Sequence, residues 1–168
     1  MIIRLFLVLL CFLSFCATSR VRLDPPIGLR VIDSNGMLSP RLMVLIRDHL
    51  YQAGYPVIYP DQSPELSQLE SMQTGDSFTT PLSQDQIICV VREEHVKDCR
   101  TIKLNLTVWL LSHQRQTVLL RKDITVTGTS THPHPGIAIH EARTQADQQI
   151  RQILHQIIQP LKSQEIAP

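Results

Sequence analysis

Hydrophobic and polar residues alternate with a period of two along residues 102–127, the clearest pattern in the chain. Alternation of this kind is typical of antiparallel strands that bury one face. The apolar positions are Ile102, Leu104, Leu106, Val108 and Leu110, then Val118, Leu120, Ile124 and Val126. Polar residues 113–116 interrupt the run, and Lys122 breaks the alternation once. The pattern therefore predicts two long strands joined by a turn.

Three shorter apolar runs predict further strands. Residues 28–33, 56–59 and 86–92 each contain valine and isoleucine, and Ser34-Asn35-Gly36 forms a turn after the first run. Residues 60–84 are rich in Asp, Ser, Pro, Thr, Gly and Gln, with only Leu66 and Leu69 suggesting a helical turn. We expect this stretch to be a long, mobile loop or insertion.

Two segments have the 3.6-residue period of an amphipathic helix. The first begins with Ser39 as N-cap and Pro40 at the first helical position, and Gly54 ends it. The second runs from Ile139 to Leu161 with glutamines on its polar face, and Pro160 marks its end. Because an isolated helix gains little stability, both helices must pack on the sheet.

These elements predict an α+β fold in the order β-α-β-β-β-β-α. We expect a small two-layer sandwich, with a mostly antiparallel sheet of four to five strands packed by two helices. Residues 20–168 would form this single domain, with a flexible insertion at residues 60–84.

Residues 1–19 have the pattern of an export signal. Arg4 precedes eleven apolar or uncharged residues, 5–15, whereas a membrane-spanning helix needs about 20. Residues 13–16 resemble the lipobox that precedes a lipidated cysteine, although Phe15 is larger than that pattern requires. We favour lipidation of Cys16, which would anchor the domain to a membrane; cleavage after Ser19 is the alternative.

Two cysteines remain in the mature domain, Cys89 and Cys99. In an exported chain an even pair favours a disulfide. With Cys89 opposite Cys99, residues 93–95 would form a three-residue hairpin loop. Two free thiols are the first alternative, and a metal site is the second.

Trp109 and Leu111 lie on the face of the predicted strand that alternation assigns to solvent. The insertion or the first helix would cover them in one interpretation. In the other they form an interface with an apolar partner surface, since exposed aromatic residues often mark interfaces.

The composition and the motifs of the chain argue against several classes of function. The 168 residues include 16 basic and 15 acidic side chains, and this balance disfavours dedicated nucleic-acid binding. No phosphate-binding glycine loop, zinc-protease helix or nucleophile elbow is present in the sequence. His132, His134 and His140 could bind a metal, but the intervening prolines favour a turn. We therefore expect no enzyme, metal or cofactor, although distant residues can still assemble a catalytic site.

The order of elements resembles that of the LPS-assembly lipoprotein family (LptE). The local resemblance is best at residues 29–39, where a strand ends in an Asp-Ser turn and a Leu-Ser pair begins the helix. It extends to residues 47–57 and, by pattern, to residues 103–127 and 139–161. The resemblance implies a non-catalytic plug inside an outer-membrane β-barrel protein (LptD-like) that assists lipopolysaccharide delivery to the cell surface.

A plug of this kind would lie at the periplasmic face of the bacterial outer membrane, held by a lipid anchor, or else in the periplasm. Lipopolysaccharide carries phosphates, which basic side chains recognise. Arg115, Arg121 and Lys122 are the candidate contacts, and ordinary solvated charges are the alternative. Two other functions remain open: a periplasmic interaction lipoprotein that activates a cell-wall enzyme or supports a secretion apparatus, and a small extracytoplasmic hydrolase.

Overall fold

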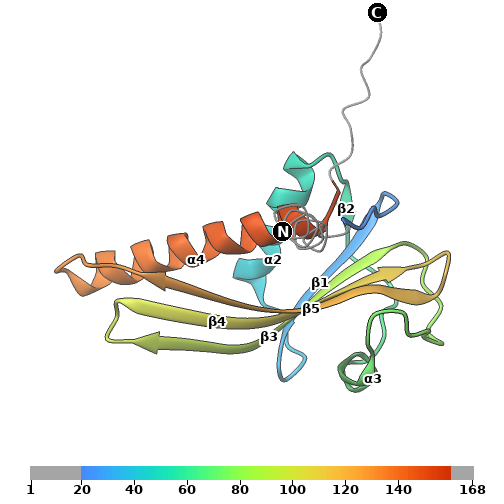
Figure 1. Ribbon diagram of the computed structural model, residues 1–168, viewed down its shortest axis with the longest axis horizontal. Helices are drawn as coiled ribbons and strands as arrows, with labels where there is room; N and C mark the ends of the chain where they lie inside the picture. The colour runs from blue at the N-terminus through green and yellow to red at the C-terminus, as the bar shows by residue number, and fades with distance from the viewer. Residues whose placement is uncertain (1–19, 160–168) are drawn as a thin grey trace, which may run out of the picture.

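A five-stranded sheet with the strand order β2-β1-β3-β4-β5 forms the centre of the protein, seen in a computed structural model that describes residues 20–159 (Figure 1). The strands are β1 (Ile27–Asp33), β2 (Val57–Ile58), β3 (Gln86–Lys97), β4 (Thr101–Ser112) and β5 (Thr117–Thr129). The helices are α2 (Pro40–Gln52), α3 (Leu66–Ser71) and α4 (Pro135–Ile157). The predicted α+β class is confirmed, with α3 as an additional element.

The sheet is mixed, and its longest pairings are antiparallel, as predicted. Strand β1 runs parallel to both of its neighbours, β2 and β3. Strands β3, β4 and β5 pair antiparallel. Pairing between β1 and β3 ends at Asp33 and Val91. The three antiparallel strands continue past that point, and we call residues 92–97, 101–107 and 123–129 the distal sheet.

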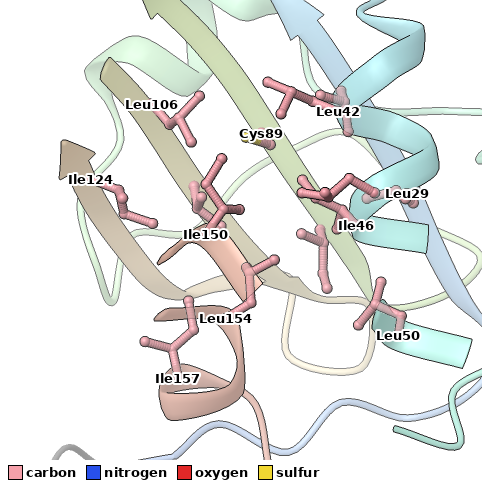
Figure 2. Packing of buried hydrophobic residues seen from close by; sticks show 14 of the residues in the cluster. Leu29, Leu42, Ile46, Leu50, Cys89, Leu106, Ile124, Ile150, Leu154 and Ile157 are labelled. Carbon is pink, nitrogen blue, oxygen red and sulfur yellow. The ribbon is translucent and has the colours of Figure 1, made fainter. Parts of the chain in front are cut away.

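The main core lies between one face of the sheet, the inner face, and helices α2 and α4. Figure 2 shows Ile46 and Leu50 of α2 and Ile150 and Leu154 of α4 directed toward the strands. These residues belong to the apolar faces that the 3.6-residue period predicts for the two helices. Burying both apolar faces against one face of the sheet gives the two-layer arrangement predicted from the sequence.

Helix α4 lies directly on the backbone of β5. A Cβ atom added to Gly128 would lie 1.7 Å from the carbonyl oxygen of Ala142 and 3.0 Å from the amide nitrogen of Ala146. Ala142 and Ala146 are both fully buried. Small side chains on the helix and a glycine on the strand therefore permit this close approach.

A second core lies on the opposite, outer face of the sheet, under residues 60–84. Its members are Ile32, Leu69, Met72, Phe78, Leu82, Ile88, Val90, Trp109, Leu111 and Val118. The helical turn suggested by Leu66 and Leu69 exists as α3. The segment expected to be a structureless loop is therefore a cover for half of the outer face.

Candidate interaction surfaces

The predicted Cys89–Cys99 disulfide is wrong for this structure, in which both cysteines are free. Cys89 lies opposite Val108, and the three-residue loop falls at residues 98–100 instead of 93–95. At about 3.3 Å per residue, the Cα atoms of Cys89 and Cys99 are over 20 Å apart, whereas a disulfide requires about 4.4–6.8 Å. Residues 93–95 belong to β3, although the polar run at 92–95 lacks the alternation of a half-buried strand.

The two thiols differ in environment. Burial raises the pKa of the Cys89 thiol to about 12. Cys99 is exposed in the turn between β3 and β4, where it adopts a positive φ of 52°. Only the thiolate is a good nucleophile, so Cys89 is chemically protected in the folded protein.

Trp109 and Leu111 are fully buried, at 0% exposure each, so they do not form an exposed interface. Residues 60–84 cover them, in agreement with the first of the two interpretations of their position. Strict alternation places them on the outer face correctly. Alternation alone does not reveal that a segment distant in sequence covers that face.

Arg121 is engaged in holding this cover on the sheet. Its guanidinium donates hydrogen bonds to the carbonyl oxygens of Met72 (3.0 Å) and Glu70 (3.3 Å). Its backbone amide donates to Oγ1 of Thr74 at 2.9 Å. Its guanidinium carbon also lies 5.6 Å from the ring centroid of Trp109. This arginine therefore has a structural role.

The structure does not bring Arg115, Arg121 and Lys122 into one cluster. Arg115 is exposed in the turn between β4 and β5. Lys122 pairs with Val108, a main-core residue, and therefore lies on the inner face. Arg121 pairs with Trp109 on the outer face. A single phosphate group does not reach all three.

Asp85 is a buried polar residue that the sequence analysis missed. The carboxylate is 5% exposed and accepts hydrogen bonds from the backbone amides of Asp24 (2.8 Å) and His113 (2.9 Å). The ring Nδ1 of His113 lies 2.8 Å from the same carboxylate. The three contacts join the segment before β1, the start of β3 and the turn after β4. In the sequence Asp85 lies among other polar residues, and no motif identifies it.

The outer face of the distal sheet is polar. Arg92 and the buried Thr107 adjoin the covered half, and the described side chains farther along this face are half-buried or exposed. Thr107 donates from Oγ1 to the Asp123 carboxylate at 2.7 Å, and Thr125 donates to Asn105 at 2.9 Å. Arg92 forms an ion pair with Glu70 of α3 at 2.6 Å, at the boundary with the covered half. The exposed or half-buried side chains on this face include Thr101, Lys103, Asn105, Asp123, Thr125, Thr127 and Thr129.

The two edges of the distal sheet differ. Gln149 of α4 donates to the carbonyl of Thr127 (2.9 Å) and accepts from its amide (3.3 Å). Gln145 accepts from the amide of Thr129 at 2.6 Å. The outer edge of β3 pairs with no other strand beyond Val91 in the part of the chain that the structure describes. An unpaired edge of this kind presents backbone groups to another polypeptide.

The described chain begins beside the end of α4. The amide of Val21 donates to the carbonyl of Ile157, and the amide of Gln159 donates to the carbonyl of Val21, each at 2.9 Å. Cys16 and the export signal lie outside the described residues. Within residues 20–159, no helix is both long and apolar enough to span a membrane.

Residues 20–159 contain no group of three metal-binding side chains close enough to hold an ion. The imidazole of His132 accepts a hydrogen bond from the amide of His134 at 3.1 Å, in the turn before α4. His132 and His134 lie in this turn, whereas His140 lies within α4.

No family model matches the chain, and no curated protein is similar to it in sequence. Solved structures with a similar course of the chain include the hypothetical protein CT253 from Chlamydia trachomatis, with 8% identity and a TM-score of 0.49 over 76% of this chain and 91% of that one. Protein XCC0632 of Xanthomonas campestris, from family DUF330, has 14% identity and a TM-score of 0.46 over 80% and 88%. Lipoprotein GNA1162 of Neisseria meningitidis has 13% identity and a TM-score of 0.39 over 80% and 97%. At these values the likeness says nothing about what this chain binds.

Proposed function

We propose that this protein is a non-catalytic envelope lipoprotein, anchored through Cys16, that works by inserting its distal sheet into a partner. The observation that supports this proposal best is the distal sheet itself. It extends beyond the main β1–β3 pairing, leaves a polar outer face uncovered, and has an open edge at β3.

The chemistry of this surface suits a polar cavity. The interior of an outer-membrane β-barrel is polar, and large barrels enclose wide lumens. Threonine, asparagine and lysine side chains can form hydrogen bonds with such a wall, and β4 spans about 40 Å over its 12 residues. These properties support the finer proposal, based on the resemblance to the LPS-assembly lipoproteins, that the partner is an LptD-like barrel.

The position of the proposed lipid anchor at Cys16 is compatible with insertion of the distal sheet into a partner. Val21 lies five positions after Cys16, so the two Cα atoms are at most about 18 Å apart. Val21 bonds to Ile157 at the C-terminal end of α4, and the distal sheet bonds to α4 at Gln149 and Gln145, about 12–18 Å along the helix from that end. A lipid on Cys16 would hold the main core near the membrane and leave the distal sheet free to enter a partner.

Contact with lipopolysaccharide is a separate part of the proposal. Of the three basic candidates, Arg115 has an exposed side chain, whereas Arg121 is bound to the cover of the second core. We expect Arg115→Glu to weaken binding of lipopolysaccharide to the protein. Unchanged binding would exclude the β4–β5 turn as a lipopolysaccharide contact.

The test of the main proposal is co-purification from detergent-solubilised outer membrane. We expect the full chain to bring down a β-barrel protein, and the double substitution Thr125→Arg/Thr127→Arg to abolish this by placing two charges on the distal face. Thr79→Arg, an exposed position in the insertion, is the matched control. Recovery of a soluble or peptidoglycan-bound partner would support the periplasmic interaction lipoprotein instead.

A further inference from the structure

A groove of about 450 Å³ lies on the outer face beside β1, away from the distal sheet. Its walls come from β1, from the chain that follows β2 and from the insertion. The lining residues are Arg30, Leu38, Tyr59, Pro60, Asp61, Gln62, Ser63 and Thr80. None of these residues was a predicted site residue, because they come from four segments that are separated in the sequence.

Arg30 is the cation of this groove. It lies opposite Ile88 in the sheet, so its side chain projects from the outer face. Its neighbours on that face are covered: a Cβ at Gly28 would lie 3.2 Å from Pro60, and Ile32 belongs to the second core. Arg30 therefore lies where the cover of the outer face is interrupted. Among the described residues, no carboxylate forms an ion pair with it.

The rim of the groove is apolar and exposed. Leu38 is 52% exposed and Tyr59 is 54% exposed, and their neighbours in the sequence, Met37 and Ile58, are exposed as well. The hydroxyl of Tyr59 lies 2.9 Å from the Met43 sulfur of α2, which fixes the ring beside the opening. Arginine, tyrosine and methionine are enriched where proteins bind each other, and arginine and tyrosine are frequent hot spots.

We infer that this groove binds a segment of a partner polypeptide that carries a carboxylate next to an apolar side chain. A guanidinium binds a carboxylate through two parallel hydrogen bonds, and here no internal partner competes for it. Leu38 and Tyr59 provide the surface for the adjacent apolar side chain. Asp61 on the same wall repels ligands with several negative charges, such as lipid phosphates, more strongly than a single carboxylate. The groove is a second contact surface, and it does not depend on the distal sheet or on the barrel partner.

A displayed library of random ten-residue peptides tests this inference on the full chain in detergent micelles. Selection against the wild-type protein, with removal of peptides that also bind Arg30→Gln, is expected to enrich Asp or Glu beside an aliphatic or aromatic residue. An enriched peptide is then labelled with fluorescein and titrated by fluorescence polarisation. We expect at least a tenfold loss of affinity for Arg30→Gln and for Tyr59→Ser, and no change for Lys103→Gln on the distal face.

Replacing the acidic residue of that peptide by its amide should lower the affinity for wild type tenfold and leave the affinity for Arg30→Gln unchanged. A selection that enriches no acidic peptides, or binding that is insensitive to Arg30→Gln, overturns the inference. Arg30-dependent flotation with phosphatidylglycerol vesicles, in the absence of peptide binding, overturns it in favour of a lipid headgroup. Melting temperatures of both variants verify that they fold. If Arg30→Gln does not fold, the loss of peptide affinity in Tyr59→Ser decides the test.

Discussion

Arg121 of β5 lies over the ring of Trp109 on β4, with the guanidinium carbon 5.6 Å from the ring centroid. The two residues are direct neighbours across the strands, and the same guanidinium reaches two carbonyl groups at the end of α3. The pair therefore connects the sheet to the segment that covers it.

Replacing Arg121 by alanine should loosen this cover. We expect the free energy of unfolding to fall by about 1–2 kcal/mol, from the lost cation–π contact and hydrogen bonds. Urea unfolding followed by tryptophan fluorescence measures the change, and Trp109 is the one tryptophan of the chain. Arg115→Ala, in an exposed turn, is the control and should stay within about 0.5 kcal/mol. Equal effects of the two substitutions would contradict the structural role of Arg121.

Replacing Gly128 by alanine should separate α4 from β5. The added methyl group would lie 1.7 Å from the Ala142 carbonyl oxygen, so the helix has to move. We expect a loss of about 3 kcal/mol, measured by urea unfolding with circular dichroism. The matched control is Gly136→Ala near the start of α4, where the new atom would be 3.5 Å from the nearest side chain. Full stability of Gly128→Ala would show that the helix does not pack this closely.

The stability of the protein should fall as the pH is lowered through the range of histidine titration. Burial lowers the pKa of His49 below its ordinary value of 6.5, and nearby His155 and Arg151 lower it further. The unfolded chain therefore binds the proton more readily than the folded chain. The contribution of His49 to the free energy of unfolding is complete above pH 6.5. It is lost as the pH falls from 6.5 toward the lower pKa of His49 in the folded protein.

Urea unfolding at pH 7.5 and pH 5 measures this dependence. His49→Gln should have a smaller difference between the two pH values than the wild type. His140→Gln, an exposed position on α4, should keep the wild-type difference. An unchanged pH dependence in His49→Gln would remove His49 as its origin.

The two cysteines of the domain should react with maleimide at very different rates. Cys99 is exposed and should be labelled in the native protein, whereas Cys89 is buried with a pKa of about 12 and should be labelled only in urea. Peptide mass spectrometry distinguishes the two sites. Recovery of a Cys89–Cys99 disulfide peptide from the envelope would instead restore the pairing expected from the sequence.

Asp85→Ala should destabilise the protein strongly. The substitution leaves the amides of Asp24 and His113 without their buried acceptor, at a cost of about 2–4 kcal/mol. Thermal unfolding measures this, and Asp61→Ala on the exposed groove wall serves as the control. A small effect of Asp85→Ala would mean that solvent readily replaces the carboxylate.

The regular elements of the fold were predictable because each carries its own local period. Alternation identified β4 and β5, and the 3.6-residue stripe identified α2 and α4. The distal part of β3 was not predicted because residues 92–95 are all polar, so the sequence has no alternation there. The burial of Trp109 depends on a segment about 30 residues earlier in the chain, and local patterns do not contain that contact.

The candidate surfaces were less predictable than the fold. Lipidation of Cys16 stays a prediction from a motif, and Arg30, Tyr59 and Asp85 gain their roles only from residues that the topology places beside them. Arg121 was predicted to contact lipopolysaccharide, whereas its guanidinium donates to the carbonyl groups of Glu70 and Met72. These carbonyl groups belong to residues about 50 positions earlier in the chain, so no local sequence pattern reveals the contact.

Gln145 and Gln149 of α4 bond to the backbone of β5 and so cover that edge of the distal sheet. The edge at β3 stays accessible. When two copies pair through this edge, each covers the accessible edge of the other, and neither distal sheet keeps an edge for a further strand. Two copies of the chain could therefore join edge to edge, but a third could not extend the ribbon there, which limits association at this site to finite, one-to-one complexes rather than fibrils.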